Sequence, residues 1–152
     1  MVQIDGVIIK KLKKKCDKRG WLAEIYRKDF DNIKIVMSYI SYTKFNVARG
    51  PHEHKKQKDF FVFIGPGNFE ISLWDNRKKS KTYRNKIKII AGEKKEISVL
   101  IPPGVIHGYK SISKKGSFCI NLPDKLYSGN KKKGKIDEIR YEENKKSEFK
   151  II

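Results

Sequence analysis

The stretch Arg49-Gly50-Pro51-His52-Glu53-His54 carries two of the three histidines of this chain, and Pro102-Pro103-Gly104-Val105-Ile106-His107-Gly108-Tyr109 carries the third. On a β-strand, successive side chains point to opposite faces, so His52 and His54 face the same side. Glycine and proline in both stretches are typical of short strands that end in tight turns. Because every histidine falls in one of two such stretches, we expect the three to form one site.

The rest of the chain consists of short apolar runs between polar or Gly/Pro-rich breaks, with almost no helical periodicity. In Phe69-Glu70-Ile71-Ser72-Leu73, for example, apolar and polar residues alternate. Many short strands at this spacing are typical of a sandwich, jelly roll or barrel, so the sequence predicts an all-β fold. The expected strands are 6–11, 20–26, 33–45, 59–64, 68–75, 86–90, 96–101, 107–111 and 117–121.

Length and composition predict one domain, residues 1–152, with a true core, because 38% of the residues are hydrophobic. The apolar runs are far shorter than the roughly 20 residues that span a bilayer, and residues 1–30 do not resemble a secretion signal. Cys16 and Cys119 are an isolated pair, not a disulfide framework. We therefore expect a cytoplasmic protein without a membrane partner.

The charge is strongly positive, with 36 basic and 17 acidic residues giving +19. The lysines are spread along the whole chain, however, and many lie where turns are expected. This spread indicates a solvated surface more than a nucleic-acid site, and it leaves open a cationic site for a small anionic substrate. The charged segment 125–152 is expected to form a short helix or an arm.

Four motifs in order carry a family resemblance. They are Asp17-Lys18-Arg19-Gly20-Trp21-Leu22-Ala23-Glu24 (D-x-R-G-x-x-x-E), the R-G-x-H of residues 49–52, Phe69-Glu70-Ile71 followed by 75–83, and the I-P-x-G-x-x-H-G-Y of residues 101–109. His-x-His followed by an acidic residue and glycine, and then P-x-G-x-x-H, resembles the cupin superfamily. The full set is similar to the dTDP-4-dehydrorhamnose 3,5-epimerase-like family of nucleotide-sugar epimerases, over residues 6–127.

The resemblance implies a cupin jelly roll that acts as a homodimer, with the active site inside the barrel and the strands of residues 1–30 shared across the dimer. It implies an isomerase that needs no cofactor and acts on a nucleoside-diphosphate-linked 4-keto-6-deoxyhexose in surface-polysaccharide or lipopolysaccharide biosynthesis. It leaves open whether C3, or C3 and C5, are inverted.

The resemblance also implies roles for individual residues. His52 matches the base that removes the proton next to the ketone, and Glu70 matches an acidic position that orients this base. A histidine suits the task because its pKa lies near neutrality. The developing enolate needs positive charge or hydrogen-bond donors, expected from His54 or Arg49, and the diphosphate needs basic side chains. Substrate contacts are expected from Arg19, Trp21, Glu24, Arg49, His54, Asp59, His107 and Tyr109.

Two positions depart from the family pattern. The segment Gln57-Lys58-Asp59 puts Asp59 where the family has a lysine that stabilises the enolate, and Lys58 would point to the other face. The family's tyrosine acid is also missing, since the corresponding region is Phe118-Cys119-Ile120-Asn121. We hypothesise that Tyr39 supplies the hydroxyl, with Tyr42 and Cys119 as weaker alternatives. A purely structural role for Tyr39 remains equally open.

Other interpretations remain open at this stage. The R-G-x-H-x-H-K of residues 49–55 also resembles the cupin 3,4-ketoisomerases of the same sugar nucleotides. His52, His54, Asp59 and His107 match the 3-His/1-carboxylate ligand set of metal cupins. A metal site requires Asp59 to point inward beside the histidines, whereas the epimerase interpretation gives His52 a carboxylate partner and lets His107 contact substrate. A binding module for sugars or nucleic acid is least supported.

Overall fold

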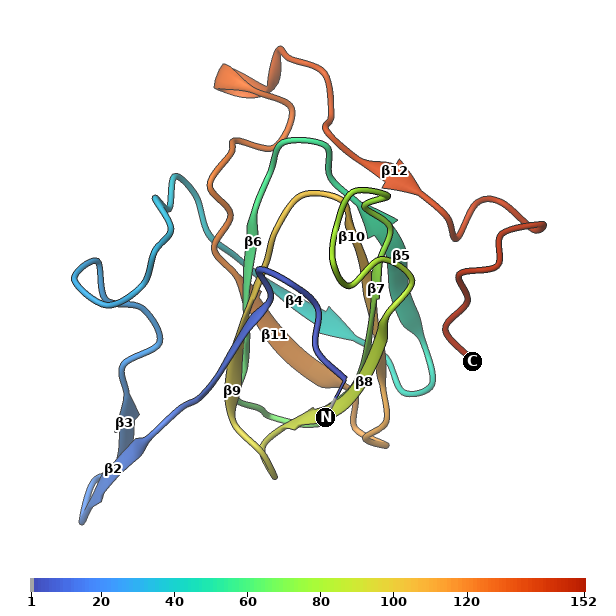
Figure 1. Cartoon of the computed structure of the whole chain (residues 1–152). Helices are drawn as coiled ribbons and strands as arrows, with labels where there is room; N and C mark the ends of the chain where they lie inside the picture. Colours follow the sequence, from blue (N-terminus) through green and yellow to red (C-terminus); the bar gives the residue numbers. More distant parts are fainter. Residues whose placement is uncertain (1) are drawn as a thin grey trace.

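Residues 2–152 of the computed structural model are described here, and they form two five-stranded antiparallel sheets packed face to face as a jelly roll (Figure 1). The strand orders are β1-β9-β6-β11-β4 and β12-β5-β10-β7-β8, and β2-β3 form a separate hairpin. No helix in this part of the chain is long and apolar enough to span a membrane. The strands are β1 (Ile8–Lys11), β2 (Lys14–Asp17), β3 (Gly20–Ala23), β4 (Tyr39–Thr43), β5 (Ala48–Glu53), β6 (Asp59–Phe63), β7 (Asn68–Asp75), β8 (Lys86–Gly92), β9 (Ile97–Ile101), β10 (Val105–Ser111), β11 (Ser117–Asn121) and β12 (Ile139–Arg140).

The expected all-β jelly roll is confirmed, and strands 68–75 and 117–121 have the predicted bounds. Three strands were not predicted: β2, β5 and β12. β5 contains Gly50 and Pro51, two residues that are depleted in strands, so the local pattern hides it. The expected strand 33–45 is confined to β4.

The core lies between the two sheets and is built from alternating residues. Phe69, Ile71 and Leu73 of β7 face inward, and Phe61 and Phe63 face them from β6. The Phe63 and Phe69 rings lie 5.5 Å apart, edge to face. The opposite face of β6 is covered by the N-terminal segment, so a second cluster forms there from Leu12, Ile33, Phe60, Val62 and Leu100.

Gly50 allows β5 to approach β10 closely. Its φ is +80°, and a Cβ at this position would lie 2.7 Å from the carbonyl oxygen of His107, closer than real contacts permit. The register places His52 opposite His107 and, beyond a bulge, Arg49 opposite Tyr109. The glycine therefore helps bring the two histidine-bearing strands together.

The two ends of the chain are placed differently. The β2-β3 hairpin extends away from the jelly roll (Figure 1), and Trp21 on it is 54% exposed. The segment 125–152 contains a short 3-10 helix, η1 (Asn130–Lys132), and folds back onto the body instead of forming an arm. Its strand β12 pairs with β5, and the Phe149 ring packs 6.0 Å from Trp74.

The turn after β7 is stabilised by Asp75, which is 2% exposed. Its carboxylate accepts hydrogen bonds from Arg77, Ser80 and Thr82. Burial raises the pKa of Asp75, but these donors outweigh burial and hold the pKa below its usual range. The ionised form therefore stabilises the fold above the unfolded pKa of about 3.9, and this contribution is lost as pH falls toward the folded value.

We expect Asp75→Asn to reduce the free energy of unfolding by about 2–3 kcal/mol at pH 7, because it removes the charge that pairs with Arg77. The difference from the wild-type chain should shrink when the pH is lowered below about 4. Urea unfolding at the two pH values measures this, and a pH-independent difference would contradict it.

Candidate active site

Three histidines and one aspartate meet at one end of the jelly-roll interior. His52 lies on β5, His54 directly follows that strand, His107 lies on β10, and Asp59 begins β6 on the facing sheet. One ligand atom from each lies within 4.8 Å of the others. The ring centroids of His52 and His107 are 4.6 Å apart. The expectation that the histidines form one site is confirmed.

Asp59 points inward beside the histidines and is 1% exposed. Its Oδ1 accepts hydrogen bonds of 2.8 Å from both the Gln57 and the Asn121 side-chain amides. Its Oδ2 lies 3.1 Å from His54 Nε2 and 3.0 Å from His107 Nε2. Burial raises the pKa of Asp59, but the two imidazoles outweigh burial and hold it well below its usual range. Asp59 is therefore a buried carboxylate.

His54 and His107 are oriented by backbone carbonyls. His107 Nδ1 lies 3.0 Å from the Val105 oxygen, and His54 Nδ1 contacts the Asp137 oxygen. Because a carbonyl only accepts, each Nδ1 carries the proton and each Nε2 faces Asp59. Burial lowers the pKa of His54, but the contacts with Asp59 outweigh burial and raise the pKa to about 9.

His52 is the most exposed of the three histidines and has its own carboxylate partner. Its Nδ1 lies 3.5 Å from Oε1 of Glu138, the residue before β12. The other oxygen of Glu138 accepts a 2.7 Å hydrogen bond from Arg140. Burial, together with the neighbouring His107 and His54, lowers the pKa of His52 to about 2, so its imidazole is neutral at pH 7.

Glu138 was not among the expected site residues. It lies in a segment dense in lysine and glutamate, where a carboxylate is indistinguishable in sequence from the solvated surface. Only the pairing of β12 with β5, which places Arg140 opposite His52, brings it to the histidines. No local signal would have identified it.

Two open cavities meet at His52. Tyr39, His52 and Glu138 line both of them. One, of about 390 Å³, is further lined by Ser41, Arg49, Phe61, Tyr109 and Arg140. The other, of about 440 Å³, is further lined by His54, Met37, Leu126, Tyr127, Lys131 and Lys132.

Tyr39 points into this space from β4. Its hydroxyl accepts a 3.0 Å hydrogen bond from Asn121, the same amide that holds Asp59. Burial raises the pKa of Tyr39 to about 12, so the phenol keeps its proton at neutral pH. The Tyr42 hydroxyl instead donates to the Lys115 carbonyl, and Tyr42 does not line either cavity at His52. The structure therefore favours Tyr39 over Tyr42 as the hydroxyl near His52.

Arg49, Tyr109 and Cys119, the other candidates near His52, differ in whether they line a cavity. Arg49 lines the first cavity, and its guanidinium donates to Thr43 Oγ1 and to the Tyr42 carbonyl. Tyr109 also lines it, although it is 4% exposed. Cys119 is 2% exposed, lies 3.3 Å behind the Ser41 hydroxyl and lines neither cavity. Because it lines neither cavity, Cys119 is not placed to deliver a proton to substrate.

The expectation that Glu70 orients His52 is wrong. The inward residues of β7 are its neighbours Phe69 and Ile71, so the alternation turns Glu70 to the outer face. There it pairs with Lys88 at 2.8 Å. The carboxylates beside the histidines are Asp59 and Glu138.

The direct substrate contacts expected of Asp59 and His107 are not supported either. Both are at least 98% buried behind the other two histidines and line neither cavity at His52. Arg19, Trp21 and Glu24 lie on or beside the projecting hairpin β2-β3 and are not brought to His52 within this chain. Arg19 pairs with Asp17, and Glu24 pairs with Arg27.

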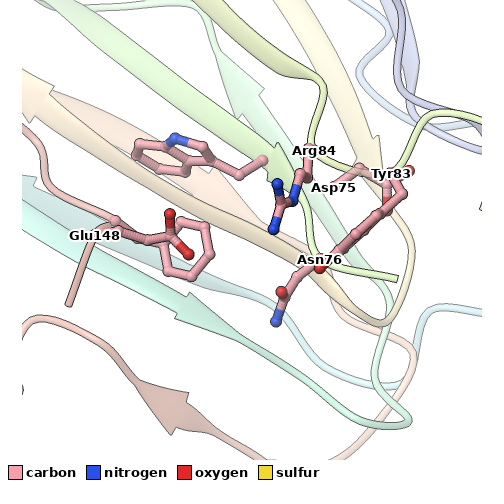
Figure 2. A pocket seen from close by; sticks show the side chains of 7 residues that line it. Asp75, Asn76, Tyr83, Arg84 and Glu148 are labelled. Atoms are coloured by element: carbon pink, nitrogen blue, oxygen red, sulfur yellow. The ribbon is translucent and has the colours of Figure 1, made fainter. Parts of the chain in front are cut away.

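A separate cavity of about 210 Å³ lies where the C-terminal segment crosses Trp74 (Figure 2). Glu148 lies on one side of it, and Asn76, Tyr83 and Arg84 lie on the other. None of the expected site residues lines it, so it is not the site of the histidines.

Comparisons with known proteins identify the family. The family model described as dTDP-4-dehydrorhamnose 3,5-epimerase matches residues 1–142. The chain is 35% identical over 130 residues to the probable low-salt glycan biosynthesis epimerase Agl13 of Haloferax volcanii, covering 84% of this chain and 83% of the relative. It is 38% identical over 109 residues to the spore coat polysaccharide biosynthesis protein SpsL of Bacillus subtilis, covering 70% and 71% of the two chains.

A crystal structure of a dTDP sugar isomerase from Desulfovibrio desulfuricans G20 superposes with a TM-score of 0.81, at 18% identity, covering 93% of this chain and 87% of that one. This likeness confirms the fold. The resemblance drawn from the four sequence motifs is likewise confirmed by the family match and the two relatives. The chain belongs to the dTDP-4-dehydrorhamnose 3,5-epimerase family of isomerases.

Proposed function

We propose that the protein epimerises a nucleoside-diphosphate-linked 4-keto-6-deoxyhexose at C3, next to the ketone. The observation that carries this proposal is the junction of the two cavities, where a neutral imidazole and a protonated phenol line the same space. Epimerisation beside a ketone needs a base to remove a proton and an acid to return one to the opposite face. His52 and Tyr39 supply these two groups.

His52 is the base in this proposal, and Glu138 positions it. The neutral imidazole can accept the proton; burial disfavours the imidazolium that forms, and the Glu138 carboxylate 3.5 Å from its Nδ1 offsets part of that cost. Tyr39 then protonates the carbon from the other side and is reprotonated from solvent. Arg49, on the wall of the first cavity, lies near enough to His52 in the β5 strand to place positive charge beside the enolate oxygen.

Basic side chains at the cavity walls support a diphosphate-bearing substrate. Arg49 and Arg140 line the first cavity, and Lys131 and Lys132 line the second. Guanidinium and ammonium groups bind phosphate oxygens by charge-assisted hydrogen bonds. Part of the +19 net charge of the chain would then form a cationic surface around the site that attracts the diphosphate.

The setting of the reaction is also proposed. We infer a homodimer in the cytoplasm, in which the hairpin β2-β3 of one protomer reaches the site of its partner with Arg19, Trp21 and Glu24. The projection of this hairpin and the exposure of Trp21 support the arrangement. The names of the two relatives, a glycan biosynthesis epimerase and a spore coat polysaccharide biosynthesis protein, support a role in surface-polysaccharide biosynthesis, of which lipopolysaccharide is one form.

Proton exchange in D₂O tests the reaction. The protein is incubated with several nucleotide-linked 4-keto-6-deoxyhexoses, and mass spectrometry and proton NMR locate the deuterium. We expect label at C3, with product couplings that show inversion at that carbon. Label at both C3 and C5 would extend the reaction to a 3,5-epimerisation.

A 3,4-ketoisomerisation is the second candidate, because His52 and His54 lie side by side with ring centroids 5.5 Å apart. A neutral imidazole and a protonated one on the same side of the substrate can move a proton between neighbouring carbons. Label at C3 with the ketone moved to that carbon would establish this reaction instead. The absence of label with every substrate would overturn both candidates.

A further inference from the structure

We propose that His54, Asp59 and His107 bind a divalent transition-metal ion, with Zn²⁺ as the type case. The proposed epimerisation uses His52, Glu138 and Tyr39, and it assigns no role to the buried His54, Asp59 and His107. Two imidazoles and one carboxylate form a ligand set that binds Zn²⁺ and similar ions while leaving coordination positions open.

The first observation is a pair of polar atoms without hydrogen-bond partners. Among residues 2–152, neither Asp59 Oδ2 nor His107 Nε2 makes a hydrogen bond, although both residues are at least 98% buried. The two atoms lie only 3.0 Å apart, but the direction of approach is wrong for a hydrogen bond. Buried polar atoms are rarely left in this state, so a missing third group that both atoms face is indicated.

The second observation is the orientation of the donor atoms. The carbonyls of Val105 and Asp137 fix Nδ1–H of His107 and His54 and turn both Nε2 atoms toward Asp59, where His54 Nε2 also lies 3.3 Å from the Gln57 side-chain amide. Gln57 and Asn121 donate to Oδ1 of Asp59 and leave Oδ2 free. Metal-binding histidines and carboxylates are held by outer partners of this kind.

The spacing also agrees with a metal. Two ligand atoms that each lie about 2.1 Å from a tetrahedral ion are about 3.4 Å apart. Asp59 Oδ2 lies 3.1 Å from His54 Nε2 and 3.0 Å from His107 Nε2, and all donors of the cluster lie within 4.8 Å. Small shifts of the His54 and His107 rings would therefore form the site.

His52 belongs to the same cluster of four donors, and the proposal leaves it outside the ligand set because it lines both cavities as the proposed base. The ion would lie beside it, at the end of the cavity lined by His52 and His54. When bound, the ion supplies positive charge beside the substrate ketone oxygen, where this chain has Asp59 in place of the family's lysine. This last role, unlike the binding itself, rests on the proposed epimerisation.

Metal content measures the binding without any substrate. The full chain is stripped with a chelator, incubated with Zn²⁺, passed through a desalting column and analysed by inductively coupled plasma mass spectrometry. We expect about one Zn²⁺ per chain. Asp59→Asn and His107→Gln should each lower the retained zinc at least about 10-fold, since outer partners alone already change metal affinity 10–100-fold. Glu70→Gln, on the outer face, is the matched control and should retain the metal.

Co²⁺ titration of the wild-type chain keeps the test independent of how the variants fold. Visible absorption bands that saturate at one equivalent, and that Zn²⁺ removes, would support the site. A wild-type chain that retains no zinc and gives no such bands would overturn it and would leave a shared proton as the only occupant. Equal zinc in Asp59→Asn and the wild-type chain would overturn it as well.

His52→Gln separates this proposal from the proposed function. The variant should keep its zinc and lose proton exchange at C3. If the wild-type chain retains no zinc but exchanges the proton at C3, the metal site is overturned and the proposed epimerase stands. If it retains zinc but exchanges no proton on any substrate, the metal site stands and the proposed epimerase is overturned.

Discussion

His52→Gln is expected to lower the turnover of a nucleotide-linked 4-keto-6-deoxyhexose about 1000-fold, the middle of the range that one general base contributes. Glutamine keeps much of the size of histidine but cannot accept a proton at neutral pH. Glu138 would then have no imidazolium to stabilise, and Tyr39 would have no enolate to protonate. Deuterium incorporation at C3, followed by NMR, should fall by the same factor.

Glu70→Gln is the matched control for this change, because Glu70 pairs with Lys88 on the outer face of β7 and should not affect turnover by more than about twofold. Thermal melting of both variants shows whether the fold is preserved. If His52→Gln kept wild-type exchange and His54→Gln abolished it, the base would be His54, and the assignment made from the cavity geometry would be wrong.

Tyr39→Phe is expected to lower formation of the inverted product about 100- to 1000-fold, the lower part of the range for a positioned acid. The ring remains to pack against the cavity wall, and only the hydroxyl that Asn121 contacts is lost. Because His52 is intact, the proton next to the ketone still exchanges with solvent on its original face. In D₂O we therefore expect label to persist at C3 while the inverted sugar disappears.

Tyr42→Phe is the control, since its hydroxyl contacts only the Lys115 carbonyl within the described chain, away from both cavities. A wild-type rate of inversion in Tyr39→Phe would limit this tyrosine to packing. Loss of both exchange and inversion would show instead that the hydroxyl stabilises the enolate, since the first step would then fail with the second.

The amino-acid sequence alone determined the class of fold and the family, and it singled out His52 as the residue proposed as the base. These rest on local patterns, because a strand shows itself by alternation over five to eight residues, as in β7, and turns show themselves by glycine and proline. The two histidine stretches could be recognised for the same reason. Residues two apart in an extended segment point to the same side, so the sequence predicts that His52 and His54 lie on one face, and their ring centroids are 5.5 Å apart in the structure.

Only the tertiary structure decided which carboxylates contact the histidines. Glu138 reaches His52 only because β12 pairs with β5, and Asp59 reaches His54 and His107 only because β6 lies on the facing sheet. The outward position of Glu70, in contrast, follows from the alternation of β7 that the sequence already shows, and the motif match overlooked it. The distance between two side chains on different strands depends on register and on sheet packing, and these are set by the whole core, not by neighbours in sequence.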